Sequence, residues 1–163
     1  MPGSEKGTAP PEKAGPTVGQ RPVELHRWLR RLISTGLAVA WMGLIFQLSS
    51  LSPGELPSQF DAFVWMRDLR SIAGHLVLYG VLGPLLLFSL WSWATGSVSR
   101  SRWALVAIGL GVLYGVTDEF HQSFVTGRIA SGFDVFVDTV GVVCGVAGVW
   151  LLARAAQHRR ARG

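Results

Sequence analysis

Acidic side chains lie inside or beside apolar stretches of this sequence, where a charge is costly and commonly functional. Asp118 and Glu119 end one apolar run, while Asp134 and Asp138 begin the next one, four residues apart. His75 begins another apolar run and supplies an imidazole. Histidine and carboxylates together can bind a cation or carry out acid–base chemistry. No two of these residues have a dedicated metal-ligand spacing such as HExxH, so the sequence by itself assigns neither a metal nor a cofactor.

Four apolar runs must position these residues, over 32–51, 74–93, 103–117 and 133–152. A helix needs about 20 residues to cross the hydrocarbon core of a bilayer. The third run is too short on its own, so its helix must carry Asp118, Glu119 and Gln122 to the membrane boundary. Only 15% of the 163 residues are charged and 49% are hydrophobic, which is too little charge to cover a soluble domain. The sequence therefore predicts an all-α, four-helix transmembrane bundle.

The distribution of Lys and Arg predicts the orientation of this bundle. All but three of the 15 basic residues precede the first run, separate the second from the third, or follow the fourth; the exceptions are Arg67, Arg70 and Arg128. Basic residues concentrate on the cytoplasmic side of a membrane protein, so we expect both termini in the cytoplasm (N-in, C-in). The net charge of +5 lies beside apolar runs instead of on an amphipathic surface, which argues against a nucleic-acid partner. We expect a multi-pass protein of the bacterial plasma membrane, with the lipid bilayer as its immediate partner.

The regions outside the four runs have compositions of their own. Residues 1–22 are rich in Pro, Gly, Ser and Thr, and we expect them to be a disordered cytoplasmic tail. Residues 23–154 then form the four-span domain, and 155–163 form a basic cytoplasmic tail. Between the first two spans, Phe60, Phe63 and Leu69 are compatible with a short helix on the outer surface or with an ordinary loop.

Helix geometry brings polar groups of three spans to one level. At a rise of 1.5 Å per residue, Tyr79, Asp118 and Asp138 all lie roughly 5–10 Å below the predicted outer interface. The fourth span carries a stripe with the steps of one helix face, made of Asp134, Asp138, Gly141, Gly145 and Gly148. The third span carries a similar stripe, made of Gly111, Gly115, Asp118 and Gln122. Small residues let helices approach closely, so both stripes are expected to pack within the bundle or, through Gly111/Gly115 or Gly141/Gly145, between copies in a homo-oligomer.

Several of these residues also have a purely structural interpretation. Asp134 lies at the N-terminal end of a span and is interpreted first as a helix cap. Asp118 and Glu119 lie near the negative end of a helix dipole, so His75, Arg128, a bound cation or protonation must offset their charge. Tyr79 fits an interfacial aromatic belt as well as a site. His121, offset from the polar stripe, is expected to face solvent, and Gly127 to be a turn residue with positive φ.

The sequence resembles the VanZ-like family of small bacterial membrane proteins. The resemblance rests on HLVLYGVLG from His75, on YGVTDEFHQSFVTGR from Tyr114 and on the two aspartates within FDVFVDTVGVVCG, and it covers residues 45–148. It implies a four-span bundle and, for the founding members, low-level resistance to the glycopeptide teicoplanin, without an established reaction. The polar positions that recur in the family map onto His75, Tyr79, Asp118, Glu119, Gln122, Arg128, Asp134 and Asp138. The chain departs from the family at Ile72, where relatives often carry lysine, and at Thr126, where they often carry proline.

Four functions are compatible with these observations. The leading hypothesis is a polar site near the outer leaflet that binds a lipid-linked envelope precursor or a lipoglycopeptide, as a teicoplanin-tolerance role would require. The second is a membrane enzyme that acts on an envelope substrate at the outer interface, with His75, Asp118, Glu119 and Asp138 holding a hard or borderline metal ion or doing acid–base work and no single catalytic residue assigned. A structural scaffold, whose polar groups fix the order of the helices, is the third. A proton-coupled transporter is the fourth and is disfavoured, because few polar residues continue into the cytoplasmic half.

Overall fold

The computed structural model describes residues 21–52, 64–95 and 99–162. These residues form four helices: α1 (Arg21–Ser50), α2 (Val64–Trp93), α3 (Arg100–Gln122) and α4 (Gly132–Arg160). Each is long and apolar enough to cross a membrane, and the described ranges contain no strand. The predicted all-α, four-helix bundle is therefore confirmed. As predicted, α3 extends beyond its apolar part and ends at Gln122.

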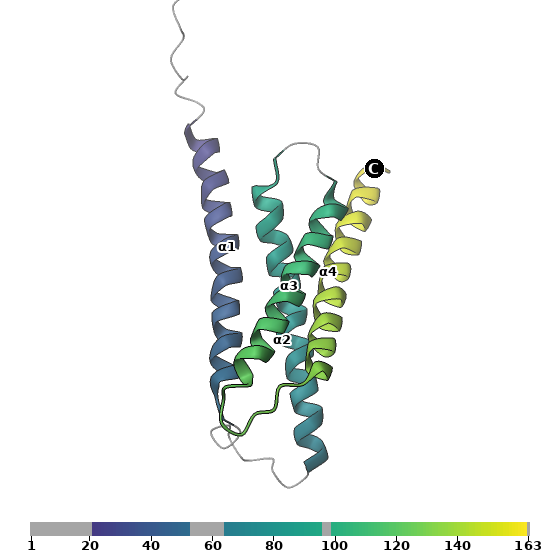
Figure 1. The fold of residues 1–163 in the computed structure, drawn as a ribbon. Coiled ribbons are helices and arrows are strands. Elements are labelled where there is room, and N and C mark those ends of the chain that lie inside the picture. The colour runs from purple at the N-terminus through teal and green to yellow at the C-terminus, as the bar shows by residue number, and fades with distance from the viewer. Residues whose placement is uncertain (1–20, 53–63, 96–98, 163) are drawn as a thin grey trace, which may run out of the picture.

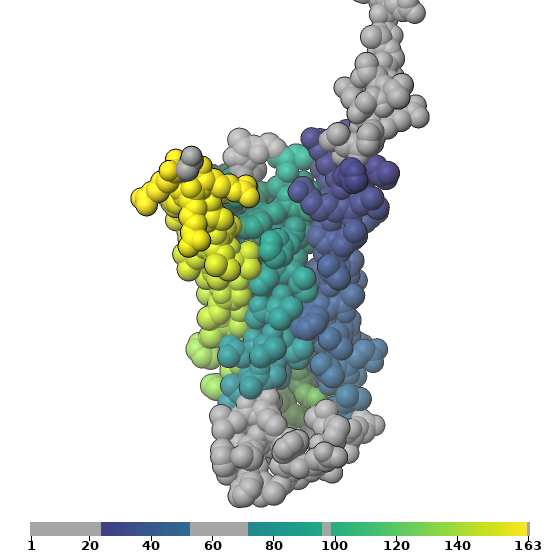
Figure 2. All heavy atoms as spheres, turned by 180° about the vertical axis from the view of Figure 1, so that it is seen from behind, coloured from purple at the N-terminus to yellow at the C-terminus, as the bar shows by residue number. Residues whose placement is uncertain are grey.

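The four helices run side by side, and α2 contacts all three others (Figures 1 and 2). The closest pairing is between α2 and α4, while α1 packs on α2 and α3 and has no contact with α4 in the described ranges. The start of α1, the end of α2, the start of α3 and the end of α4 lie at one end of the bundle, which we call the terminal end (Figure 1). The loop from α3 to α4 lies at the opposite end, which we call the loop end. The chain thus passes back and forth four times, as alternating spans require.

Each helix extends beyond its predicted apolar run, and α1 does so by beginning at Arg21, inside the expected disordered tail. The first residues of α2, from Val64 onward, belong to the segment for which a surface helix or a loop was expected; they continue into α2 without a break. Phe60 and Phe63 lie outside the described residues, as do residues 1–20 of the expected disordered tail. At the other terminus, α4 continues to Arg160, so most of the expected basic tail is helical.

Glycines bring α2 and α4 into backbone contact. A Cβ on Gly83 of α2 would lie 2.7 Å from the carbonyl oxygen of Val142, and one on Gly141 of α4 would lie 2.8 Å from that of Leu76. A Cβ on Gly145 would meet the carbonyl oxygen of Gly80 and come within 2.7 Å of Pro84 Cδ. Only a residue without a side chain fits at such a helix crossing.

The glycine stripes predicted from the sequence are confirmed in part. Gly111 and Gly115 of α3 face α4, where they meet Val142 and Asp138. Gly145 packs on α2 instead of α3, because α2 has small residues of its own that permit the closer approach. Gly148 was expected to belong to the packing stripe; that is wrong, because it is exposed and has no neighbour within 4 Å of a built Cβ.

The outside of the bundle is apolar. Large hydrophobic side chains stay exposed on every helix, for example Leu37 on α1 (55%), Val77 on α2 (62%), Leu105 on α3 (69%) and Leu152 on α4 (72%). In water such a surface would be buried by association, whereas in a bilayer it contacts lipid chains. Between the helices, a small core of Ile45, Leu82, Leu87, Ala107, Val142 and Val146 is buried. The apolar outside and the narrow core are those of a membrane-spanning bundle.

Hydrogen bonds join α1 to α2 near the terminal end. The hydroxyl of Ser34 donates to Ser92 Oγ over 2.9 Å, Thr35 and Ser89 pair over 2.9 Å, and Trp93 Nε1 donates to Thr35 Oγ1 over 2.9 Å. Since lipid offers no competing partners, such bonds fix the relative position of two spans.

Candidate functional site

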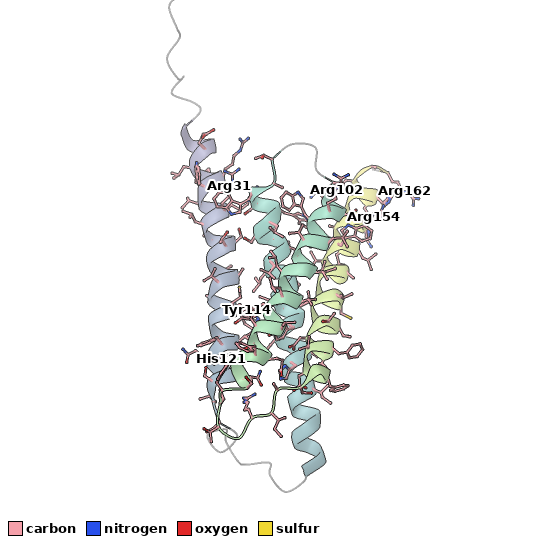
Figure 3. The ribbon with its side chains drawn as sticks, viewed as in Figure 1. Arg31, Arg102, Tyr114, His121, Arg154 and Arg162 are labelled. Carbon is pink, nitrogen blue, oxygen red and sulfur yellow. The ribbon has the colours of Figure 1, made fainter. Side chains whose placement is uncertain are left out.

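The eight predicted polar residues gather toward the loop end of the bundle, in two groups. Figure 3 shows His121 at this end, whereas Arg31, Arg102, Arg154 and Arg162 lie at the terminal end. Five of the eight are buried: Tyr79, Asp118, Glu119, Gln122 and Asp138, each exposed by 5% or less. The expectation that they face neighbouring helices instead of lipid is confirmed for these five.

The first group, here called the Asp118 network, is held together by one carboxylate oxygen. Asp118 Oδ2 accepts hydrogen bonds from Ser49 Oγ at 2.8 Å, from Gln122 Nε2 at 3.1 Å and from Tyr79 OH at 3.3 Å. The donors come from α1, α3 and α2 in turn, so a single carboxylate joins three helices. Tyr79 is 1% exposed and belongs to this network instead of to an aromatic belt.

Arg128 completes the Asp118 network from the loop after α3. Its guanidinium donates to Gln122 Oε1 at 3.0 Å and to the carbonyl oxygens of Leu51 and Leu48, both at 3.1 Å. These carbonyls lie at the C-terminal end of α1, where backbone acceptors lack helical partners and the helix dipole attracts a cation. Arg128 was one candidate to offset the charge of Asp118 and Glu119. It binds the end of α1 instead, and makes no ion pair with either acid.

The second group, here called the His75 cluster, consists of His75, Glu119, Asp134 and Asp138. His75 Nδ1 lies 2.9 Å from Asp138 Oδ1, which joins α2 to α4. Glu119 Oε2 accepts from the backbone N–H of Ser131 at 2.8 Å, which fixes the start of α4 against α3. A ring nitrogen of His75 and one carboxylate oxygen each of Glu119 and Asp134 all lie within 4.8 Å of one another. Three helices therefore deliver one imidazole and three carboxylates to one place.

Three buried carboxylate oxygens in the two groups have no hydrogen-bond partner among the described residues. They are Asp118 Oδ1, Glu119 Oε1 and Asp138 Oδ2. A buried acceptor without a donor costs about 1–3 kcal/mol, and more when it carries charge. Buried polar groups are nearly always paired, so unpaired ones commonly indicate a site that a ligand or ion completes. Within the described part of the chain, the negative charge of these acids is therefore only partly balanced by hydrogen-bond donors and cations.

Two single-residue predictions are corrected. Asp134 is not the cap of α4, because Ser131 occupies that position and its hydroxyl accepts from the N–H of Phe133 at 3.2 Å. Asp134 lies in the first turn, where the positive end of the dipole still favours it. His121 does not simply face solvent: it is half-buried, its Nε2 lies 3.0 Å from Ser50 Oγ, and its ring stacks on Phe46. Gly127 has a φ of 81°, as predicted for a turn glycine.

Sequence reasoning missed Ser49 and Ser131. Ser49 is an ordinary small polar residue near the end of an apolar run, and nothing in its neighbours along the chain indicates that it binds an acid of another helix. Ser131 could have been found, because a serine three residues before Asp134 is the usual start of a helix with an acidic first turn. At Ile72, where relatives often carry lysine, the sequence offers Arg67 or Arg70 as a substitute cation, but both side chains lie outside the described side chains.

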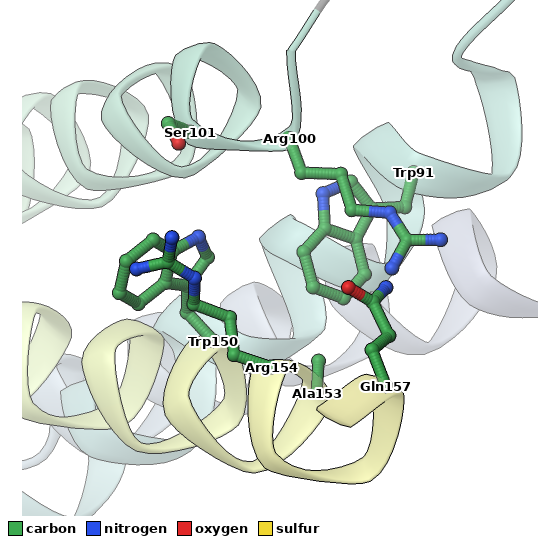
Figure 4. A pocket seen from close by; sticks show the side chains of 7 residues that line it. All are labelled: Trp91, Arg100, Ser101, Trp150, Ala153, Arg154 and Gln157. Carbon is green, nitrogen blue, oxygen red and sulfur yellow. The ribbon is translucent and has the colours of Figure 1, made fainter. Parts of the chain in front are cut away.

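A pocket of different chemistry lies at the terminal end (Figure 4). Its walls come from the end of α2, the start of α3 and the last turns of α4, and consist of Trp91, Arg100, Ser101, Trp150, Ala153, Arg154 and Gln157. The guanidinium of Arg154 lies 4.4 Å from the ring centroid of Trp150, and that of Arg100 lies 5.6 Å from that of Trp91. Paired arginines and tryptophans are typical of a membrane interface that faces anionic headgroups. The lining of this pocket contains no carboxylate or imidazole, unlike the two polar groups at the loop end.

Comparison with known proteins assigns a family to this arrangement. A family model described as VanZ/LLP1 matches residues 35–153, a range that includes both polar groups and most of each helix. Neither the curated proteins nor the solved structures contain a match.

Proposed function

Because the chain belongs to the VanZ/LLP1 family, we propose that its buried polar site binds a ligand of the bacterial cell envelope. The ligand is a lipid-linked cell-wall precursor or a lipoglycopeptide such as teicoplanin. Both combine a long apolar chain with a headgroup rich in hydroxyl and amide donors. In the orientation predicted from Lys and Arg, the loop end faces the outside of the plasma membrane, where such ligands occur.

The observation that carries this proposal is the set of three unpaired carboxylate oxygens on Asp118, Glu119 and Asp138. They are acceptors that need donors, and the hydroxyl, amide and ammonium groups of a sugar or glycopeptide headgroup are donors. A hydrogen bond to a charged acceptor is worth about 1.5–3 kcal/mol when both partners leave water. A bound headgroup would therefore form hydrogen bonds that these three oxygens lack in the ligand-free protein, and those bonds would favour binding.

Exposed aromatic side chains beside the site supply a place for the apolar part of the ligand. Phe120 and Phe124 of α3 and the following loop are 68% and 72% exposed, and Phe133 and Phe136 of α4 are 56% and 61% exposed. Phe120 directly follows Glu119, and Phe133 directly precedes Asp134. A lipid-linked molecule could therefore place its headgroup against the acids while its chain stays in the bilayer.

The test compares one acid of the site with one acid remote from it. Glu119→Gln keeps the shape of the side chain and an oxygen for the N–H of Ser131, but removes the charge; Glu24→Gln changes an exposed acid of α1 at the terminal end. At matched expression, Glu119→Gln should melt like wild type and abolish both teicoplanin tolerance in cells and teicoplanin binding to the purified protein in nanodiscs. Glu24→Gln should change neither. If tolerance and binding of Glu119→Gln follow only its protein level, the site does not bind this class of ligand.

The His75–Asp138 pair favours a second candidate function. A carboxylate that accepts from one nitrogen of an imidazole orients the ring and increases its basicity, which is the usual arrangement of a general base. The bond length of 2.9 Å and the complete burial of Asp138 fit that role. The corresponding activity is hydrolysis or transfer at the headgroup of a lipid-linked substrate. It is tested by following headgroup release from lipid-linked pyrophosphates in nanodiscs; His75→Gln should abolish turnover, and wild-type protein without turnover eliminates this candidate.

A further inference from the structure

We infer that His75, Glu119 and Asp134 form a binding site for a divalent transition-metal ion, with Zn²⁺ as the best chemical match. One nitrogen of the imidazole and one oxygen of each carboxylate already lie within 4.8 Å of one another. The three residues come from α2, α3 and α4, so a bound ion would join the three helices that supply the site. Nothing in the spacing of these residues along the chain indicates the site, because 44 and 15 positions separate them.

The partner of His75 prepares the imidazole for metal binding. Asp138 Oδ1 lies 2.9 Å from Nδ1, and a fully buried carboxylate there holds the proton on Nδ1. The lone pair of Nε2 is then free to bind an ion, and Nε2 makes no hydrogen bond with any described residue. Metal-binding histidines almost always donate their other ring N–H in this way, commonly to a carboxylate. The His75–Asp138 pair is thus the expected support for a metal ligand.

The two carboxylates are each short of a partner. Glu119 is 5% exposed, with Oε2 held by the Ser131 N–H and Oε1 unpaired and buried. The Asp134 side chain is half-buried and has no hydrogen bond to any described residue. Two buried or half-buried acids this close repel each other unless a cation lies between them. Arg128, the described arginine that donates into the neighbouring Asp118 network, is engaged with Gln122 and the end of α1.

The ligand set and its geometry favour Zn²⁺ over harder cations. Catalytic zinc sites combine three protein ligands, at least one of them an imidazole, with an open fourth position, and the site here supplies one imidazole and two carboxylates. Mg²⁺ and Ca²⁺ instead prefer oxygen ligands alone. Zinc ligands bind at about 2.0–2.2 Å, which places tetrahedral neighbours about 3.4 Å apart. The observed separations, at most 4.8 Å, therefore need only side-chain rotation to close on an ion. Two carboxylates and a divalent cation also cancel in charge, which removes the main cost of burying the acids.

Metal binding is measured on the purified protein without any envelope ligand, so its failure and the failure of the proposed function are distinguishable. The protein, freed of purification tags and chelated, is dialysed against Zn²⁺, Mn²⁺ or Mg²⁺ in detergent, and its metal content is measured by plasma mass spectrometry. Wild type should retain about one Zn²⁺ per chain and melt at a higher temperature with Zn²⁺ than without. His75→Gln, Glu119→Gln and Asp134→Asn should each weaken Zn²⁺ binding by roughly 100-fold, and Asp138→Asn by roughly 10–100-fold. His158→Gln, at the terminal end, should bind Zn²⁺ like wild type.

Two outcomes overturn the inference. The first is that wild-type protein retains no more Zn²⁺ than the His75→Gln variant at the same free Zn²⁺ concentration. The second is that the His158→Gln control loses Zn²⁺ binding. Because a variant could lose metal through misfolding, Co²⁺ provides a readout on wild type alone. A four-coordinate site of nitrogen and oxygen ligands gives intense visible absorption bands that Zn²⁺ displaces. A Co²⁺ sample without such bands would refute the site even if every variant failed to fold.

Discussion

Asp118 has an architectural role that can be measured directly, because its Oδ2 joins three helices, while its other oxygen, Oδ1, is one of the unpaired acceptors of the proposed ligand site. Its Oδ2 accepts three hydrogen bonds, two of which come from other helices. In membrane proteins each such bond contributes about 0.6–1.7 kcal/mol. We therefore expect Asp118→Ala to lower the free energy of unfolding by about 2–5 kcal/mol, since it removes all three bonds and leaves the buried hydroxyls of Ser49 and Tyr79 without this acceptor.

Three other substitutions, two at the same hydrogen bonds and one at the adjacent residue, are compared with Asp118→Ala. Asp118→Asn should cost less, because its amide oxygen can accept in place of Oδ2. Tyr79→Phe removes the longest of the three bonds, at 3.3 Å, and should cost about 0.6 kcal/mol. Thr117→Ala is the matched control: Thr117 is the adjacent residue of α3, is exposed and bonds only within its own helix. It should leave the free energy of unfolding unchanged.

The measurement is reversible unfolding in mixed micelles of a mild detergent and dodecyl sulfate, followed by helicity and by tryptophan fluorescence. Ser49→Ala measured alone and together with Asp118→Ala completes a double-mutant cycle, and the two changes should be strongly non-additive because they share one bond. The assignment of an architectural role to Asp118 is refuted if Asp118→Ala unfolds like Thr117→Ala. A Glu119→Gln protein that is severely destabilised would instead assign that role to the His75 cluster.

The remaining predictions concern packing, the end of α1 and topology. Gly145→Ala should destabilise the bundle by about 1–3 kcal/mol, because its Cβ would collide with the backbone of α2. Gly148→Ala should be neutral or slightly stabilising, because its Cβ meets nothing and alanine favours a helix; equal melting temperatures of the two variants would contradict the crossing of α2 and α4. Arg128→Gln should lower stability by about 1–3 kcal/mol through its lost bonds to α1, with the exposed Arg102→Gln as a neutral control in the same unfolding assay. Reporter fusions at the C-terminus and between α2 and α3 should show a cytoplasmic location and one at Ile129 an outside location; an outside C-terminus would reverse the predicted orientation.

The number of spans and their approximate positions could be predicted because they depend on local composition. Hydrocarbon excludes unpaired backbone groups and charges, so each crossing must be a long apolar helix that is visible within its own residues. The same reasoning located the polar level, because rise per residue converts a position in the sequence into a depth. It also predicted that Asp138 and Gly141 face neighbouring helices, since steps of three and four share one face.

Partners across helices could not be predicted in the same way. The steps along α4 fix which residues share a face, but they do not say whether that face meets α2 or α3. Gly145 packs on α2 because Gly80 leaves room there, and Gly148 meets nothing because it lies on an exposed side of α4. The eight polar residues were expected to form one cluster, with Tyr79, Asp118 and Asp138 at one level. The rotation of α2, α3 and α4 about their axes instead divides them into the Asp118 network and the His75 cluster.

The sequence by itself determined that this is a four-span membrane protein with costly acids gathered near one end of its bundle. Both conclusions depend on the free-energy cost of placing polar groups in lipid, which is determined by the composition of each segment by itself. Only the tertiary structure decided that Asp118 bonds to Ser49 of α1, that Arg128 binds the end of α1 instead of an acid, and that His75, Glu119 and Asp134 converge within 4.8 Å. Those contacts join residues far apart in the chain. They depend on how each helix is rotated about its axis, which is set by the fit of all neighbouring side chains at once.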